Sequence, residues 1–219
     1  MFKLFNSSLV KKYSMAISGL FLILFLFQHF TINLTSVFSE KVFNSISHFM
    51  GNNPIVQFIL QPILIFGVVF HFVMGFVLEI QNRSSRKSRY QYFKGSENSS
   101  WVSRNMIISG LVVLSFLFLH FYDFWVPEMQ YKYINFLPED PNRYYEELVH
   151  KFHNPVRVGL YVISFIFLSL HLLHGFSSSF QSVGTDRKYA NQINILGKIF
   201  AIVVPFGFAF IAIYHHLMH

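Results

Sequence analysis

The 219-residue sequence has no cysteine and few charged side chains. Without cysteine the chain can form no disulfide, attach no haem covalently and ligate no iron–sulfur cluster of its own. Charged residues make up only 12% of the chain, about half the share of an ordinary soluble domain, whereas 53% of the residues are hydrophobic. This composition excludes a soluble globular protein and predicts an integral membrane protein.

Five apolar segments are long enough to cross a membrane, which takes about 20 residues of helix. They cover residues 14–38, 55–80, 104–126, 155–181 and 195–217. The first segment follows Lys11-Lys12 as a signal peptide would, but it has no small-residue cleavage site and is expected to remain as a helix. We therefore predict an all-α fold, a single domain over residues 1–219 that forms a bundle of five transmembrane helices.

The basic residues are distributed unequally between the two sides of this expected bundle. One side, where the odd-numbered helices begin, holds Lys3, Lys11, Lys12, Arg83, Arg86, Lys87, Arg89, Lys94, Arg104, Arg187, Lys188 and Lys198. The other side holds Lys41, Lys132, Arg143, Lys151 and Arg157 together with most of the acidic residues. Because Lys and Arg mark the cytoplasmic side, the pattern predicts a cytoplasmic N-terminus and a periplasmic C-terminus.

The connections between the segments contain no soluble domain, no glycine-rich phosphate loop and no Ser-His-Asp pattern. Residues 39–54 are expected to form a short outer loop with a turn at Asn52-Asn53-Pro54. The second outer connection, residues 127–154, contains Asn142–Glu147, which predicts the start of a short interfacial helix. The inner connection, residues 81–103, is polar and basic, which fits either a solvated segment or a docking surface.

Four histidines recur in matching contexts within the apolar segments. His71 and His171 each precede a Gly-Phe pair by four residues, and His29 and His120 each lie in a Phe-x-His-Phe sequence. A glycine one helical turn away lies on the same face as the histidine, and it leaves room there for something flat and wide. An ionisable side chain inside a membrane is costly unless it is partnered, so these histidines are candidates for function.

The depths of these histidines can be compared at a rise of 1.5 Å per helical residue. His29 and His120 come out about 25 Å from the inner face, and His71 and His171 about 15 Å. Two histidines at equal depth on different helices are what bis-imidazole ligation of a low-spin haem requires. The two layers therefore predict two haems stacked across the membrane.

Simpler roles stay open for single histidines, because one histidine in a membrane helix also serves to bridge two helices by a hydrogen bond. Two matched pairs in repeated contexts favour haem. Of the remaining histidines, His150 and His153 are expected to be solvated in the outer connection. His48 lies beside the outer layer and is better placed for chemistry. A polar tail at the outer interface is expected for His215, His216 and His219.

These residues resemble a known family, the cytochrome b membrane-anchor subunits of succinate:quinone oxidoreductases, in the five-helix, two-haem class that includes some fumarate reductases. The resemblance extends over nearly the whole chain. It rests on the order and spacing of Gln28-His29, Phe43-Asn44-Ser45, His48-Phe49-Met50, His71-x-x-x-Gly75, His120, and His171-x-x-x-Gly175 with Gly184. It implies that His29 and His120 hold the distal haem b, and His71 and His171 the proximal one.

The resemblance also implies a bacterial cytoplasmic (inner) membrane location and two cytoplasmic partners. These are a flavoprotein that oxidises succinate and an iron–sulfur subunit docked on the basic inner loops. Menaquinone is the implied quinone, bound near the distal haem; lipid surrounds the helices, no nucleic acid is expected, and further assembly of the heterotrimer stays open. One position departs from the family: fumarate-reducing members have a glutamate two residues before the helix-four ligand, where this sequence has Ser169.

Further site residues are predicted from their position along the chain. A quinone carbonyl needs a hydrogen-bond donor and a proton source, which favours His48, with Glu40 as the alternative. Propionates and acidic partner surfaces at the inner side favour contacts with basic side chains. The candidates there are Arg83, Arg86, Arg104, Arg187 and Lys188, with His174 near the propionate edge.

The leading interpretation is electron transfer from succinate through two b haems to menaquinone, with no succinate site in this chain. The nearest alternative is the dihaem subunit of a fumarate reductase, hydrogenase or formate dehydrogenase. A membrane di-iron oxygenase, suggested by His171-x-x-His174 and His215-His216-x-x-His219, would need those clusters on one side, yet five helices put them on opposite sides. A histidine-lined transporter would need acidic partners at mid-membrane, which the central apolar runs lack.

Overall fold

The computed structural model describes residues 7–84 and 105–218, and in that part of the chain the regular structure is entirely helical. Five helical stretches there are long and apolar enough to cross a membrane. They are Leu9–Phe38, Val56–Ser84, Met106–Ile134, Pro155–Ser182 and Ala190–Met218. The prediction of an all-α protein with five transmembrane helices is therefore confirmed, while the orientation of the termini stays a prediction.

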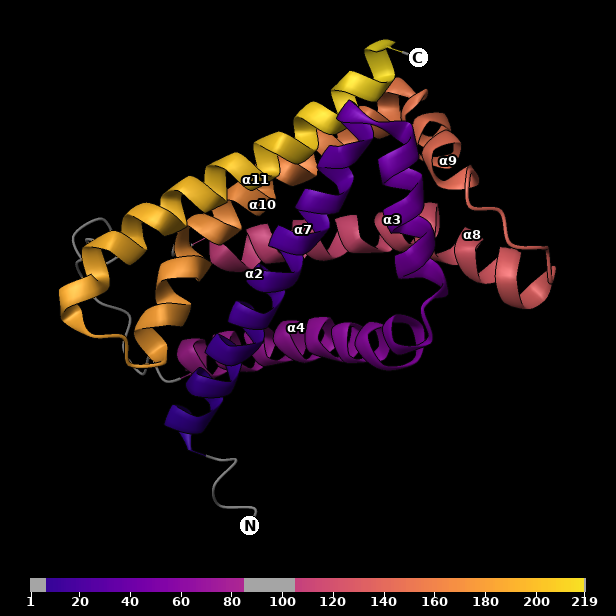
Figure 1. Ribbon diagram of the computed structural model, residues 1–219. Coiled ribbons are helices and arrows are strands. Elements are labelled where there is room, and N and C mark those ends of the chain that lie inside the picture. The colour runs from indigo at the N-terminus through magenta and orange to yellow at the C-terminus, as the bar shows by residue number, and fades with distance from the viewer. Residues whose placement is uncertain (1–6, 85–104, 219) are drawn as a thin grey trace.

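The five spans contain the long helices α2 (Ser8–Phe38), α4 (Gln61–Ser84), α7 (Met106–His120), α10 (Pro155–Ser182) and α11 (Ala190–Met218). In Figure 1, α10 and α11 run side by side, and α2 crosses in front of them from one end of the molecule to the other. Helix α10 packs against α11, α7 and α2, whereas α4 packs chiefly against α2. Helices from both halves of the chain therefore surround the middle of the bundle.

A short helix, α3 (Glu40–Asn52), occupies the region in which the sequence predicted a loop. Ser39 caps it by accepting a hydrogen bond from the backbone N–H of Val42 at 3.3 Å, and Glu40 places a negative charge in the first turn. Both features stabilise a helix N-terminus, so the signal for this helix was present in the sequence. The predicted turn at Asn52-Asn53-Pro54 therefore marks the end of α3, with Asn53 as its C-cap.

The third span is longer than predicted because the helix continues through Pro127. After α7 the chain forms the π-helical turn η2 (Phe121–Trp125), then α8 (Val126–Met129) and a second π-helical turn, η3 (Gln130–Ile134). Proline has no N–H to bond the preceding turn, and a π-helical turn absorbs the mismatch without ending the helix. Pro62 likewise follows such a turn, η1 (Val56–Leu60).

The short helix predicted from Asn142 onwards is present as α9 (Arg143–Phe152). Its apolar side buries Leu148 and Phe152 against Tyr161 and Phe165 of α10 and Phe208 of α11. This buried cluster closes one end of the bundle. It also supports the helices that carry His29 and His120.

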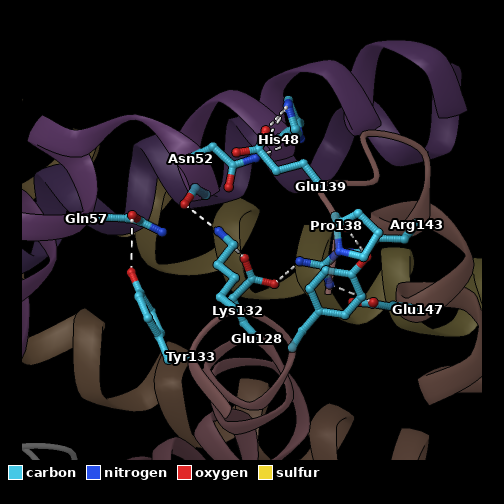
Figure 2. A network of polar contacts seen from close by, with 12 residues as sticks. His48, Asn52, Gln57, Glu128, Lys132, Tyr133, Pro138, Glu139, Arg143 and Glu147 are labelled. Atoms are coloured by element: carbon cyan, nitrogen blue, oxygen red, sulfur yellow. Dashed lines mark hydrogen bonds and ion pairs between the residues drawn. The ribbon is translucent and has the colours of Figure 1, made fainter. Parts of the chain in front are cut away.

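A network of buried charges fastens α9 to the end of the third span and to α3 (Figure 2). Arg143, whose side chain is 9% exposed, donates to Glu128 and also to Glu147 at 2.7 Å. Lys132 pairs with Glu128 and donates to the Gly51 carbonyl of α3 at 2.6 Å. Burial alone would lower the pKa of Arg143, but its hydrogen bonds to Glu128 and Glu147 raise the pKa above its ordinary value. The guanidinium therefore stays charged at any physiological pH.

Removing one partner from this network is expected to destabilise the outer end of the bundle. Arg143→Leu leaves the carboxylate of Glu128 without its main partner, and breaking a buried pair costs about 3–5 kcal/mol. We expect faster amide hydrogen exchange in α3 and α9 and a lower thermal unfolding temperature in detergent. Arg83→Leu is the matched control, because Arg83 pairs with Glu79 while 68% exposed, and such a pair contributes at most about 1 kcal/mol. Equal effects of the two changes would contradict the prediction.

Candidate haem-binding cavity

A single cavity of about 680 Å³ runs through the bundle and is lined by all four of the paired histidines. Its walls come from α2, α4, α7, α10 and α11, and most of the lining side chains are apolar. At one end it is lined by Lys12, Asn82 and Ser182, and at the other by Trp125 and Phe152. Large, mostly apolar cavities with a few convergent polar groups are typical of cofactor sites.

The structure brings the histidines together in the two predicted pairs. The ring centres of His29 and His120 are 5.8 Å apart with planes at 83°, and those of His71 and His171 are 6.4 Å apart with planes at 73°. Two metal–imidazole bonds of about 2 Å in line, with about 1 Å from each nitrogen to its ring centre, place the two centres about 6 Å apart. Both pairs therefore have the spacing of a bis-imidazole site.

The two pairs form separate layers along the bundle. On α2, His29 follows Ser18 by 11 residues, and Ser18 contacts His71 of the inner pair. On α7, His120 follows Ser109 by the same interval, and Ser109 contacts His171. Eleven residues make three helical turns, so the two layers lie on one face of each helix and about 16 Å apart.

The surroundings of the pairs fit a wide cofactor. His120 Nδ1 is buried without a hydrogen-bond partner, and such an orphan nitrogen indicates a missing group. A Cβ added at Gly19 would lie 3.4 Å from His71 Cε1, so the ring lies against the backbone of α2, and the tighter contact of 2.9 Å would be with Ser179 Oγ of α10. These features fit a wide, flat group beside the paired histidines.

The ligand clusters of a di-iron site are not formed in the part of the chain that the structure describes. No three His, Cys, Asp or Glu side chains within residues 7–84 and 105–218 gather to hold a metal ion. His171 faces His71, whereas His215 lies 2.9 Å from Ser36 Oγ. A bis-imidazole haem needs only two protein ligands, so the observed pairs suit haem better than a di-iron centre.

The prediction of a polar tail at the outer interface is wrong for His215, at the end of α11. Its side chain is 0% exposed and packs edge-on against Tyr145, with ring centres 5.5 Å apart. The ring of His216 lies with Nδ1 2.8 Å from the carbonyl of Phe152. These contacts join the end of α11 to α2 and α9, and His219 lies outside the described residues. His150 and His153 are exposed, as predicted.

The end of the cavity lined by Lys12 and Asn82 contains one of the predicted basic and polar residues that the structure describes. His174 lines it, while Arg83 is exposed and pairs with Glu79 at 2.6 Å. The Lys188 ammonium lies over the ring of Tyr189 at 5.6 Å, on the connection before α11. Arg86, Arg104 and the side chain of Arg187 lie outside the described part of the chain. Lys12, Asn82, Ser178 and Ser182 also line this end and were not singled out from the sequence.

A buried acid, Asp123, lies one turn beyond His120. From the sequence it was expected on the outer side of the bundle, with most of the acidic residues. Asp123 is 1% exposed within the third span, and Arg157 donates to it at 2.6 Å and Tyr161 at 2.9 Å. Both carboxylate oxygens are thus satisfied, as a buried charge requires. An acid inside the predicted segment 104–126 was the signal that could have marked this residue, and the expectation that the apolar runs contain no acidic partner is wrong for the third span.

Two serines that contact the inner histidines were also missed. Ser18 Oγ lies 3.0 Å from His71 Nδ1, and Ser109 Oγ lies 3.3 Å from His171 Nδ1. Both belong to the sequence Met-x-Ile-Ser-Gly, which occurs at residues 15–19 and again 91 residues later at 106–110. His29 and His120 are separated by the same 91 residues, so a search for internal repeats would have found the serines.

Comparison with known proteins agrees with this architecture. No family model matches the chain, and no solved structure matches it. The chain is similar to the succinate dehydrogenase cytochrome b558 subunit of Bacillus subtilis (strain 168), with 21% identity over 153 residues that cover 69% of this chain and 68% of that subunit. This similarity and the five apolar helices support the resemblance to the cytochrome b membrane subunits of succinate:quinone oxidoreductases.

Proposed function

We propose that this chain is the membrane-anchor and electron-transfer subunit of a succinate dehydrogenase. Two b haems would supply a one-electron path between an iron–sulfur subunit and menaquinone. The observation that carries the proposal is the pair of facing imidazoles in each of two layers, with ring centres 5.8 and 6.4 Å apart in one cavity. Four helices each contribute one ligand, His29 and His120 to the distal layer and His71 and His171 to the proximal layer.

The chain's own residues hold and insulate the two sites. The apolar walls of the cavity exclude water from the imidazoles, and burial of this kind is one of the means by which a protein tunes haem potentials. At the inner end, Lys12 and His174 offer donors for propionates. The basic residues of the inner side, Arg83, Arg86, Arg104, Arg187 and Lys188, suit docking of the iron–sulfur and flavoprotein subunits.

A pyridine haemochrome assay with reduced-minus-oxidised spectra on the purified chain tests this proposal. Two b haems per chain are expected. A chain purified from haem-replete membranes without haem would overturn the proposal. Co-purification of a flavoprotein with succinate-oxidising activity separates this function from that of a dihaem subunit of a hydrogenase or formate dehydrogenase.

The quinone is proposed to bind beside His48 on α3. The side-chain amide of Asn52 lies 2.9 Å from His48 Nδ1, so it donates to that nitrogen and leaves the imidazole proton on Nε2. Glu139 lies 3.7 Å from Nε2 and is 71% exposed, where it can pass on protons. Burial and the charge of Glu128 raise the pKa of the neighbouring Tyr144 to about 12, so this phenol stays protonated beside the imidazole.

His48→Ala is expected to lower quinone reduction while both haems remain bound. Loss of a general acid reduces a rate by about 100-fold or more. The measurement is succinate-dependent reduction of a menaquinone analogue, with the haem content of each preparation as reference. His153→Ala is the control, because His153 is exposed and lies outside α3. If His48→Ala retains normal rates and Glu40→Gln does not, the quinone contact belongs to Glu40.

A further inference from the structure

We infer that Ser18 and Ser109 are positioning residues that fix the tautomer and ring orientation of His71 and His171, so that each ring presents Nε2 to the proximal haem iron. The inference rests on the proposed function, because it concerns ligands of a haem. It goes beyond that function by assigning a role to two side chains outside the ligand set. The argument follows from counting the hydrogens at each serine.

Each serine hydroxyl has one hydrogen, and in both cases a backbone carbonyl lies where it can accept that hydrogen. Ser18 Oγ donates to the carbonyl of Met15 at 2.8 Å, and Ser109 Oγ donates to the carbonyl of Met106 at 2.9 Å. With its hydrogen used, a hydroxyl oxygen can only accept. The contacts of 3.0 and 3.3 Å to the histidines are therefore N–H donations from Nδ1 to the serine oxygen.

A neutral imidazole has a single N–H, so the proton on Nδ1 leaves a lone pair on Nε2. Histidines that bind metals usually donate their other N–H to an oxygen, which fixes the ring and raises its basicity. The two serine oxygens fill this role in the proximal layer.

The surroundings make each serine contact hard to replace. Ser18 is 7% exposed and Ser109 is 5% exposed, so water has little access to the histidine N–H, and a hydrogen bond in such a medium is strong. A Cβ at the following glycines, Gly19 and Gly110, would lie 3.4 and 3.6 Å from the respective Cε1 atoms, so each ring lies against the backbone of the helix that carries its serine.

Ordinary serines in these helices provide the comparison. Serine in an apolar helix commonly donates to a carbonyl one turn back without any further role. Ser115 does so, donating to the carbonyl of Leu111 at 3.0 Å from an exposed position on α7. Ser18 and Ser109 share that backbone contact and add the histidine. They occupy equivalent positions of the Met-x-Ile-Ser-Gly repeat, so the same arrangement occurs once in each half of the chain.

Ser18→Ala in the assembled complex tests the inference. The ring of His71 loses the acceptor for its N–H and donates less electron density, so the midpoint potential of the proximal haem is expected to rise. Haem transfer to apomyoglobin is expected to become about tenfold faster. Ser109→Ala should act in the same direction but less strongly, because the Ser109–His171 contact is longer, at 3.3 Å, than the Ser18–His71 contact at 3.0 Å.

Two control variants make the result decisive. Ser115→Ala, which removes the same type of backbone contact, should leave both potentials unchanged, and Ser18→Thr, which keeps the hydroxyl, should restore the wild-type potential. Unchanged or lower proximal potentials in both alanine variants would overturn the inference, as would an equal shift in Ser115→Ala. A wild-type chain without haem would instead contradict the proposed function. If Ser18→Ala fails to assemble, the comparison of Ser109→Ala with Ser115→Ala provides the same test.

Discussion

His171→Ala is expected to remove the proximal haem and leave the distal haem bound. The ring of His171 faces that of His71 at 6.4 Å and contacts Ser109 at 3.3 Å, which fixes its orientation. His174, three residues further along α10, lies about 5 Å nearer the inner end, too far to ligate the same iron without tilting the ring.

Redox-resolved difference spectra of the purified complex measure this loss, because the two haems titrate as separate components. The matched control is His174→Ala, which should keep both haems and at most shift the proximal potential, since His174 lines the cavity near its inner end. The opposite result, in which His174→Ala loses the haem and His171→Ala retains it, would transfer the ligand to His174.

His120→Ala is expected to remove the distal haem and, with it, quinone reduction. His120 and His29 face each other at 5.8 Å, and the surrounding rings of Phe116, Phe124 and Tyr161 hold His120 in place. The proximal layer lies about 16 Å away along the helices and should keep its haem. Quinone reduction should fall to background, while succinate oxidation by a soluble artificial acceptor continues.

Two measurements on the same preparation separate this result from general damage. The haem content should fall to half that of the wild type, and the flavoprotein should remain attached. His150→Ala is the control, because His150 is an exposed histidine on α9 that does not line the cavity. Loss of both haems in His120→Ala, with none lost in the control, would show that the two layers do not bind independently.

The five spans could be predicted because long apolar runs are the strongest signal that a sequence contains. Their ends were less predictable. The third span was predicted to end at residue 126, before Pro127. The π-helical turn at Phe121–Trp125 instead allows the helix to continue to Ile134. The helix at Glu40–Asn52 was missed although Ser39 and Glu40 are ordinary helix-start residues. Local geometry of this kind depends on how the backbone accommodates one residue, which composition does not reveal.

The pairing of the histidines could be predicted because depth follows directly from counting residues along a helix. Contacts that depend on the rotation of one helix against another could not. The contact of Ser18 with His71, which lies 53 residues away, was not predicted, because it depends on how α2 packs against α4. His215 looked like an interfacial residue by position, but the packing of α11 against α2 buries it completely.

Each pair of facing imidazoles joins the first half of the chain to the second. His29 and His71 come from the first two spans, and His120 and His171 from the next two. An iron held by either pair therefore cross-links the two halves, and this matters most for α4, which packs chiefly against α2. A ligand bound only by the folded chain adds about 4 kcal/mol of stability at a thousand times its Kd. If the proposed haems are these ligands, the amount of folded subunit is expected to follow the supply of haem.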